Sequence, residues 1–253
     1  MSSATRNSEN PNYKHNLLMM KMSWERICAV IPTYNEADNV EPLIQGLESL
    51  GCVDWILIVD DSSNDGTLEK LAQLRSEYEN LTVHVRPGKL GFGTALKEGF
   101  TLALEKFNLT RLIQMDADLS HDPSFIPDML SKQADLIIGS RYIEGGKIIG
   151  WNKRRKITSK TANFLVNTLL GLKIHDVTSG FRVYSRRAVE TIATQATAVG
   201  YEFEIEAALL ARKHQMSIEE VPITFVDRRK GETKLKTREI FRFLGFVLRN
   251  IQI

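Results

Sequence analysis

A short apolar run, residues 111–115, ends at two carboxylates that stand two residues apart, Asp116 and Asp118. Such a run is typical of a buried β-strand. In open α/β sheets ligands bind at the carboxyl ends of the strands, where these side chains would lie. Paired carboxylates suit a hard cation such as Mg²⁺ or Mn²⁺, which adds water and phosphate oxygens to its shell. The segment predicts a metal-dependent site for a phosphorylated ligand. The alternative is a solvated loop or a helix cap.

A second apolar run, residues 27–31, leads into a polar loop that contains an aromatic ring. We expect the strand to stop at Pro32, because proline cannot donate a ladder hydrogen bond. The loop carries Tyr34 and Glu36, which suit a nucleobase by stacking and by hydrogen bonds to side-chain oxygens. This loop is a candidate site for the base of a nucleotide.

Two further runs end in charged residues. Residues 55–59 lead to Asp61, and an acid at that position can bind ribose hydroxyls. Asp65 follows in the same loop, and capping of the next helix is the alternative role for it. Residues 138–140 lead to Arg141, whose guanidinium group can donate two hydrogen bonds to phosphate oxygens. Together with the metal segment, these strand ends predict a nucleoside-diphosphate site on a parallel sheet.

Apolar runs and helical patterns alternate through the first half of the chain. We predict strands that end near Ile31, Asp60, Arg86, Asp116 and Gly139. We predict helices over residues 38–50, 67–78, 91–105 and 125–130. This alternation favours an α/β fold, a single domain with a mostly parallel central sheet and helices on both faces.

The chain divides into three expected parts. Residues 1–22, rich in Ser and Asn, are expected to form a flexible N-terminal arm. Residues 23–236 are expected to form the catalytic domain, with a donor half to about residue 142 and an acceptor half after it. Residues 237–253 are expected to form a C-terminal amphipathic helix.

At these residues the first half of the chain resembles family-2 glycosyltransferases, inverting and metal-dependent enzymes that use sugar nucleotides. The second half is similar to dolichyl-phosphate (polyprenyl-phosphate) mannose synthases, of the short type without C-terminal transmembrane helices. That similarity is carried by residues 139–142, 145–146, 150–151, 155, 159, 162–163, 176–182, 221–228 and 231–235. The chain departs from the family at Thr233, where Ser is more usual, and at Ser120, where some relatives have a metal-assisting Gln.

The resemblance implies a GT-A-type nucleotide-diphospho-sugar transferase domain that moves mannose from GDP-mannose to dolichyl or polyprenyl phosphate. With inversion, the product is a β-mannosyl-phosphoryl lipid, and the cofactor is Mg²⁺ or Mn²⁺. The implied donor site is Pro32, Tyr34, Glu36, Asp61, Asp116, Ala117 and Asp118, with Asp116 and Asp118 holding the metal. The implied acceptor-phosphate site is Arg141, Arg155, Ser159, Arg228 and Lys234. The implied catalytic residues are Asp118, Arg141, Arg228 and Lys234.

Two alternatives stay open. One keeps the reaction but takes UDP-glucose or another sugar nucleotide as the donor. The other, of a different class, is a non-catalytic nucleotide-binding scaffold subunit. For Arg182, binding to backbone carbonyls near Gly180 is an alternative to a role in the site. For the glycine-rich segment 86–94, which lacks the P-loop spacing, we favour a tight turn and a helix start, with a contact to the nucleotide as the alternative.

Composition limits the partners. A net charge of +2 excludes a generic polyanion binder, so no nucleic-acid partner is expected. Cys28 and Cys52 lack metal-site spacing, and Cys28, inside a predicted strand, is expected to be a buried thiol. No segment approaches the ~18 apolar residues that span a membrane. Together with the lipid acceptor that the resemblance implies, this leads us to expect a peripheral protein on the cytoplasmic side of a membrane.

Two segments suit a membrane surface. Residues 153–170 are expected to form a helix that is basic at its start and apolar toward its end, as interfacial helices are. The alternative is that the basic residues are an ordinary solvated charge run at the start of a helix that packs in the core. In the last helix, Arg238, Arg242 and Arg249 fall on one side, and apolar residues cover the rest. That apolar arc could pack on the sheet, contact lipid, or bind a small membrane-anchoring partner subunit.

Overall fold

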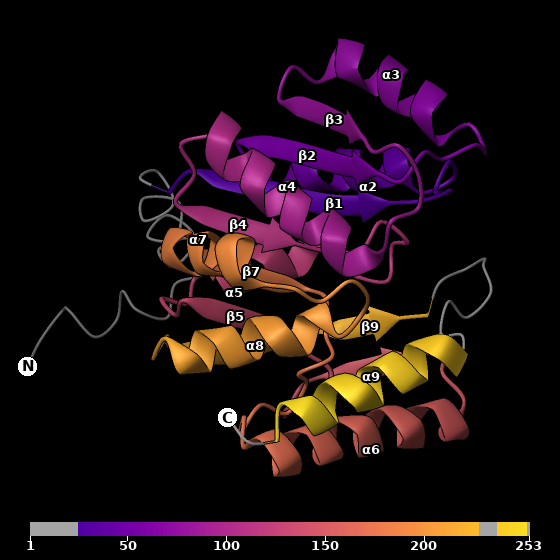
Figure 1. The fold of residues 1–253 in the computed structure, drawn as a ribbon. Coiled ribbons are helices and arrows are strands. Elements are labelled where there is room, and N and C mark those ends of the chain that lie inside the picture. Colours follow the sequence, from indigo (N-terminus) through magenta and orange to yellow (C-terminus); the bar gives the residue numbers. More distant parts are fainter. Residues whose placement is uncertain (1–24, 228–236, 252–253) are drawn as a thin grey trace, which may run out of the picture.

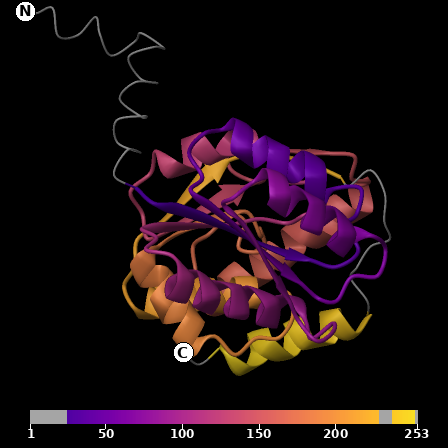
Figure 2. The same ribbon diagram turned by 90° about the horizontal axis from the view of Figure 1, so that it is seen from above.

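The computed structural model describes residues 25–227 and 237–251 and contains a twisted seven-stranded sheet (Figures 1 and 2). The strand order is β3-β2-β1-β4-β7-β5-β8. These strands are β1 (Ile27–Thr33), β2 (Trp55–Asp60), β3 (Leu81–Val85), β4 (Arg111–Gln114), β5 (Leu136–Ser140), β7 (Arg182–Ser185) and β8 (Ile218–Pro222). A separate two-stranded sheet pairs β6 (Lys147–Ile149) with β9 (Thr224–Val226).

The sheet is mostly parallel, which confirms the predicted fold class. The pairs β1–β2, β1–β4, β2–β3 and β5–β8 are parallel. Strand β7 runs antiparallel between β4 and β5. The carboxyl ends of β1, β2 and β4 therefore lie side by side at one edge, and the end of β5 lies at the same edge beyond β7.

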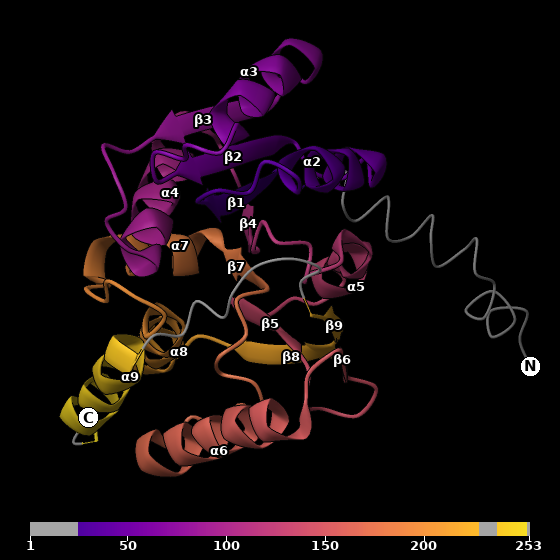
Figure 3. The same ribbon diagram turned by 90° about the vertical axis from the view of Figure 1, so that its right-hand side faces the viewer.

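Helices cover both faces of the sheet (Figure 3). The helices are α2 (Val40–Ser49), α3 (Thr67–Glu77), α4 (Phe92–Lys106), α5 (Ile126–Leu130), α6 (Lys153–Leu170), α7 (Arg186–Gln195), α8 (Phe203–Lys213) and α9 (Thr237–Arg249). A short 3₁₀ turn, η1 (Pro123–Phe125), precedes α5. Alternate strand residues point to opposite faces, so Ile27 and Ala29 pack under α2, α3 and α5, whereas Cys28 and Val30 pack under α4, α7 and α8.

Helices α6 and α9 contact each other at the end of the molecule opposite α3 (Figure 1). Helix α6 begins at a cap in which the Asn152 side chain accepts a hydrogen bond from the Arg155 N–H. It ends at Gly171, whose φ of 64° belongs to the left-handed region that glycine tolerates. Both helices reach the core through buried residues, Val166 and Leu170 from α6 and Phe246 and Val247 from α9.

The five predicted strand ends lie within two residues of the observed ends. The prediction that proline would stop the first strand was wrong. Strand β1 does not stop at Pro32 but continues to Thr33, pairing with β2 through Asp60. Its pairing with β4 ends at Val30. Proline is tolerated at this point because only one side of β1 is paired there. Both cysteines are free, and Cys28 is buried, as predicted.

Candidate active site

The metal segment lies in a tight turn after β4. Leu119 occupies the left-handed region at φ 61°, a conformation typical of tight turns. The Ser120 N–H and Oγ both donate to Asp118 Oδ1, at 3.1 and 2.5 Å. Ser120 is buried, so its hydroxyl holds the Asp118 carboxylate in place. Ala117 is also buried, whereas its neighbours Asp116 and Asp118 are partly exposed.

His121 fixes the other end of this turn. Its Nδ1 accepts a hydrogen bond from the Asp116 N–H at 3.1 Å. The ring is buried, stacks on Phe181 at 5.1 Å and meets Phe225 edge-on at 5.7 Å. Burial lowers the pKa of His121 to about 4, although the Asp118 carboxylate opposes the shift. The imidazole is thus neutral near pH 7, as an accepting Nδ1 requires. The sequence pattern did not single out this residue.

The turn fits a divalent cation. The Asp116 side chain is about one-third exposed. Gly180 lies beside it, since a Cβ there would be in van der Waals contact with Asp116 Oδ1 at 3.5 Å. Over residues 25–227 and 237–251 no cluster of three or more His, Cys, Asp or Glu side chains is arranged for a metal. Mg²⁺ or Mn²⁺ held by two carboxylates takes its remaining ligands from water and phosphate, as these ions usually do.

A buried carboxylate, Glu204, lies behind the turn. It accepts a hydrogen bond from the Gln114 amide at 2.6 Å and lies 3.0 Å from Arg182 Nε. Burial raises the pKa of Glu204 to about 7, and the charge of Asp116 adds to the rise although Arg182 opposes it. Local sequence reasoning missed Glu204 because it comes from α8, far along the chain from β4.

Arg182 is a structural residue, as one of the two sequence interpretations held. It is fully buried and donates to the carbonyls of Val177, Ser179 and Glu204 at 2.7–2.8 Å. These bonds tie the segment before β7 to helix α8. The segment includes Gly180, which faces Asp116.

On the donor side, Asp61 pairs with buried Arg86. Arg86 donates to Asp61 Oδ1 at 2.5 Å, to Glu98 at 2.9 Å and to Thr94 at 2.8 Å. Burial raises the pKa of Asp61, against the opposing effect of Arg86. Asp60 instead accepts from Thr33 and Ser63 and holds the loop. Of the two acids at the carboxyl end of β2, Asp61 therefore remains the candidate for ribose.

The loop after β1 meets the glycine-rich segment. The Lys89 ammonium lies 3.7 Å from the centroid of the Tyr34 ring. Glu36 is buried and accepts from the Asn39 amide at 2.7 Å. Within the glycine-rich segment, Gly91 is the residue before α4, and the last residues of the segment form the start of that helix, in keeping with the favoured turn and helix start. Asp65 accepts from the N–H groups of Thr67 and Ala37, so it holds the start of α3.

On the acceptor side, Arg141 is held by a buried carboxylate. Its Nε and Nη2 each lie 2.6 Å from an Asp176 oxygen, and Nη2 also donates to Thr178. Burial disfavours the guanidinium charge, but Asp176 outweighs that effect and raises the pKa of Arg141. The sequence did not predict this partner. The pair fixes the direction of Arg141 at the end of β5.

Trp151 joins Arg141 to Arg155. Its ring centroid lies 5.3 Å from the Arg141 guanidinium and 4.1 Å from that of Arg155. Arg155 also donates to both Asp227 oxygens, at 2.9 and 3.0 Å. Beside this stack, the Tyr142 hydroxyl donates to Ser159 Oγ at 2.7 Å. Arg141, which follows β5, and Arg155 and Ser159, one turn apart on α6, thus belong to one connected group. Arg228 and Lys234 lie outside the described residues.

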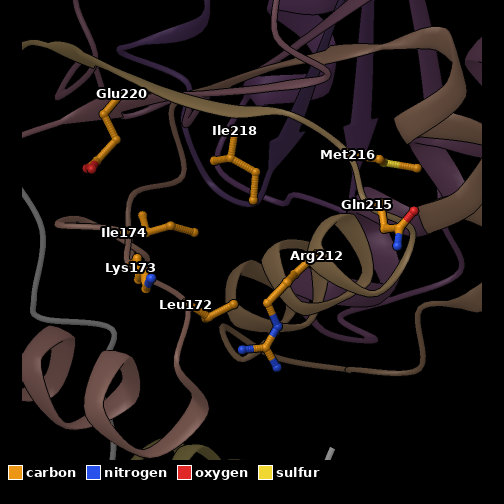
Figure 4. A pocket seen from close by; sticks show the side chains of 8 residues that line it. All are labelled: Leu172, Lys173, Ile174, Arg212, Gln215, Met216, Ile218 and Glu220. Atoms are coloured by element: carbon orange, nitrogen blue, oxygen red, sulfur yellow. The ribbon is translucent and has the colours of Figure 1, made fainter.

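Two cavities flank the segment that follows α6. One, of about 460 Å³, has Leu172, Lys173 and Ile174 along one side and Arg212 at the end of α8 on another (Figure 4). Arg212 donates to the Leu170 carbonyl and so caps the carboxyl end of α6. The other cavity, of about 480 Å³, shares Lys173 and Ile174 but opens beside α6 and Tyr142.

The chain is similar to known glycosyltransferases. Residues 28–193 match glycosyl transferase family 2. The chain is 40% identical to the polyprenol monophosphomannose synthase of Mycolicibacterium smegmatis over 222 residues, which cover 85% of this chain and 83% of that protein. It is 36% identical to the undecaprenyl-phosphate mannosyltransferase of Micrococcus luteus over 215 residues, covering 83% and 87%.

Among solved structures, the fold is similar to glucosyl-3-phosphoglycerate synthase from Mycobacterium tuberculosis in complex with Mn²⁺, UDP-glucose and phosphoglyceric acid. The TM-score is 0.70 at 18% identity, with 97% of this chain and 86% of that chain covered. This likeness places the domain in the GT-A class of folds. Within the part of the chain that the structure describes, no helix combines the length and apolarity needed to cross a membrane.

Proposed function

The chain belongs to glycosyl transferase family 2, and on that basis we propose that it transfers mannose from GDP-mannose to a polyprenyl phosphate such as dolichyl phosphate. One observation carries the proposal. The two metal-type carboxylates after β4 lie at the same sheet edge as a group of cationic and hydroxyl side chains, Arg141, Arg155 and Ser159. A site with both features suits two phosphorylated substrates, a sugar nucleotide and a phosphate acceptor.

In this proposal the acceptor needs no general base. A phosphate monoester is already largely doubly anionic near neutral pH, because its second pKa is about 6. Its oxygen can attack the anomeric carbon without giving a proton to the enzyme. Attack from the face opposite the leaving group inverts that carbon, so an α-linked donor gives a β-mannosyl-phosphoryl lipid.

Asp116 and Asp118 would hold Mg²⁺ or Mn²⁺, which when bound neutralises charge on a departing diphosphate. Ser120 and His121 keep the turn in shape by their hydrogen bonds to Asp118 and Asp116. Around the nucleotide, Tyr34 and Glu36 are proposed to contact the base, next to Pro32, and Asp61 the ribose. Pairing with Arg86 fixes the Asp61 carboxylate before the ligand binds.

The cationic group is proposed to bind the acceptor phosphate. Two anionic reactants repel each other, so fixed positive charge near both lowers the barrier. Arg141 and Arg155 are each braced by a carboxylate and by Trp151, which limits their motion. Ser159 adds a hydroxyl, and Arg228 and Lys234 complete the proposed set.

We further propose that the protein works at the cytoplasmic surface of a membrane. Exposed apolar side chains on α6 and α9 lie beside exposed cations at the start of α6. The apolar ones are Ile157, Phe164, Leu165, Leu169, Leu244 and Leu248. Anionic headgroups attract such cations, and apolar groups enter the acyl boundary. A small membrane-anchoring subunit is the proposed partner for the same face.

A donor panel tests the function. Purified protein is incubated with Mn²⁺ or Mg²⁺, undecaprenyl or dolichyl phosphate in detergent, and GDP-mannose, UDP-glucose or another sugar nucleotide. The organic extract is then analysed by mass spectrometry. Among the sugar nucleotides tested, we expect only GDP-mannose to give a hexosyl-phosphoryl lipid, and only when the metal is present. NMR of that product should show a β linkage.

Other outcomes have distinct meanings. If UDP-glucose gives the product, the proposed donor is wrong, whereas the proposed mechanism still applies. Nucleotide binding without product from any donor, even in membranes, would favour the non-catalytic scaffold.

A further inference from the structure

The cavity beside α6, called here the α6 hollow, has no place in the function proposed above. It occupies about 480 Å³ between α6 and the segment that follows that helix. Its walls include the Tyr142 ring, Phe164 and Ile174. Lys160 and Lys173 stand at its rim as exposed cations. None of the lining side chains in the described part of the chain is acidic.

The shape of the α6 hollow is fixed by amide side chains. Asn167 donates to the Ile174 carbonyl and accepts from the Ile174 N–H at 2.9 Å, which holds this wall against α6. Asn163 donates to the Ser159 carbonyl and to Thr178 Oγ1, both at 3.1 Å. Because these amides bond to neighbouring protein groups, they leave the apolar walls as the main contact for a ligand.

The α6 hollow is continuous with the proposed acceptor-phosphate group. Tyr142 lines the hollow and donates to Ser159. Thr178, bonded to Asn163 in the wall, also accepts from Arg141. A ligand whose phosphate lies at Arg141 and Ser159 therefore has an apolar surface directly beside it, with a cationic rim that favours an anionic end.

We propose that the α6 hollow binds the isoprene units next to the phosphate of the prenyl phosphate acceptor. This inference rests on the proposed function and names the part of the acceptor that the protein itself recognises. An apolar chain with one anionic end matches the apolar walls, the cationic rim and the neighbouring phosphate group. The remaining isoprene units leave past Phe164, whose exposed side lies on the proposed membrane face of α6.

The test uses a short prenyl phosphate in the absence of membranes. Farnesyl phosphate carries the isoprene units near the phosphate but needs no bilayer, so tail contact is separated from membrane docking. The variant is Phe164→Ala. The matched control is Ile157→Ala on the same helix, because the two side chains are 67% and 65% exposed and Ile157 does not line the hollow.

We expect Phe164→Ala to raise KM for farnesyl phosphate about 5- to 10-fold, because the variant loses the apolar contact between the aromatic ring and the bound isoprene units. The kcat and the KM for the sugar nucleotide should stay within about twofold of wild type, and Ile157→Ala should match wild type. If wild type is active and both variants have the same KM for farnesyl phosphate, the proposal that the α6 hollow binds isoprene units is wrong. The proposed function would still stand.

If wild type forms no product with any donor, the proposed function fails. The proposal that the α6 hollow binds isoprene units is then tested by ligand binding alone. Farnesyl phosphate binding is then measured by calorimetry. Weaker binding by Phe164→Ala than by wild type and Ile157→Ala would support the α6 hollow. No binding by wild type, or equal binding by all three proteins, would overturn it.

Discussion

At the scale of single residues, the Asp118 carboxylate provides the sharpest test of the proposed metal chemistry. Asp118→Asn keeps the size and the oxygen that accepts from Ser120 but removes the negative charge. We expect kcat to fall on the order of 100-fold or more, because the charge that holds the cation is lost. The measurement is initial rate of lipid-linked sugar formation as a function of Mn²⁺ concentration.

A neighbouring acid supplies the control. Asp122 is exposed and caps η1 by accepting from the Ser124 N–H at 2.9 Å, which asparagine can also do. Asp122→Asn should therefore keep wild-type turnover and stability. Unchanged turnover in Asp118→Asn would exclude metal catalysis by this turn.

His121 predicts a specific dependence of stability on pH. Its pKa is about 4 in the folded protein against an ordinary value of 6.5. Between these values the unfolded chain binds more protons, so the free energy of unfolding falls as pH drops from 6.5 toward 4. The His121 share of that loss is on the order of 3 kcal/mol.

Urea unfolding of wild type and His121→Phe at pH 7 and pH 4.5 measures this share. Phenylalanine keeps the stacking on Phe181 but cannot titrate, so the variant should lose less stability on acidification. It should start from a lower stability at pH 7, because the Asp116 N–H loses its acceptor. Parallel losses in the two proteins would contradict the buried, neutral imidazole.

The residues that local pattern predicted are those that follow strands. Asp116, Asp118, Asp61 and Arg141 stand out because apolar runs stop beside them. Their partners were not predictable in the same way. Asp176, the partner of Arg141, is 35 residues away in sequence, and no periodicity encodes such pairing. The burial of Glu204 likewise depends on how α8 packs.

At the scale of elements, helix α4 depends on a close approach to the sheet. A Cβ on Gly99 would lie 2.6 Å from Val30 Cγ1 and 3.0 Å from Val59 Cγ2. Gly99→Ala should therefore destabilise the protein by about 1–3 kcal/mol, because overpacking outweighs the better helix propensity of alanine. Chemical denaturation measures the change in the free energy of unfolding.

Gly245 in α9 is the matched comparison. A Cβ there would have no atom within 4 Å among the described residues. Gly245→Ala should leave the protein as stable as wild type or up to about 1 kcal/mol more stable, as helix propensity alone predicts. If both substitutions change the free energy of unfolding equally, the close packing of α4 on the sheet does not make Gly99 necessary for stability.

Elements defined by periodicity were predictable, and those defined by neighbours were not. Helix α6 occupies the predicted residues, because a cap, a basic start and a terminal glycine bound it. The antiparallel course of β7 between β4 and β5 leaves no trace in its own four residues. The same holds for β1 beyond Pro32, since that extension depends on pairing with β2 on one side only.

At the scale of the whole molecule, a net charge of +2 conceals an uneven surface. Lys153 and Arg154 begin α6 as exposed cations, on a helix that also exposes the apolar side chains of Ile157, Phe164, Leu165 and Leu169. Helix α3, with partly exposed Lys70 and exposed Arg75, lies at the opposite end of the molecule (Figures 1 and 3). Whole-chain composition cannot distinguish these ends, whereas the fold separates them.

This asymmetry predicts how the protein docks on lipid. Vesicles that contain anionic phospholipid should retain the protein in a sedimentation assay more than neutral vesicles do, and added salt should weaken retention. Lys153→Glu with Arg154→Glu should weaken binding at least about tenfold, because each basic residue near the surface contributes about 1 kcal/mol. Lys70→Glu with Arg75→Glu makes the same charge change on α3 and should bind as wild type does. If both pairs weaken binding equally, attraction depends on net charge alone, and the end of the molecule formed by α6 and α9 is not the face that meets the membrane.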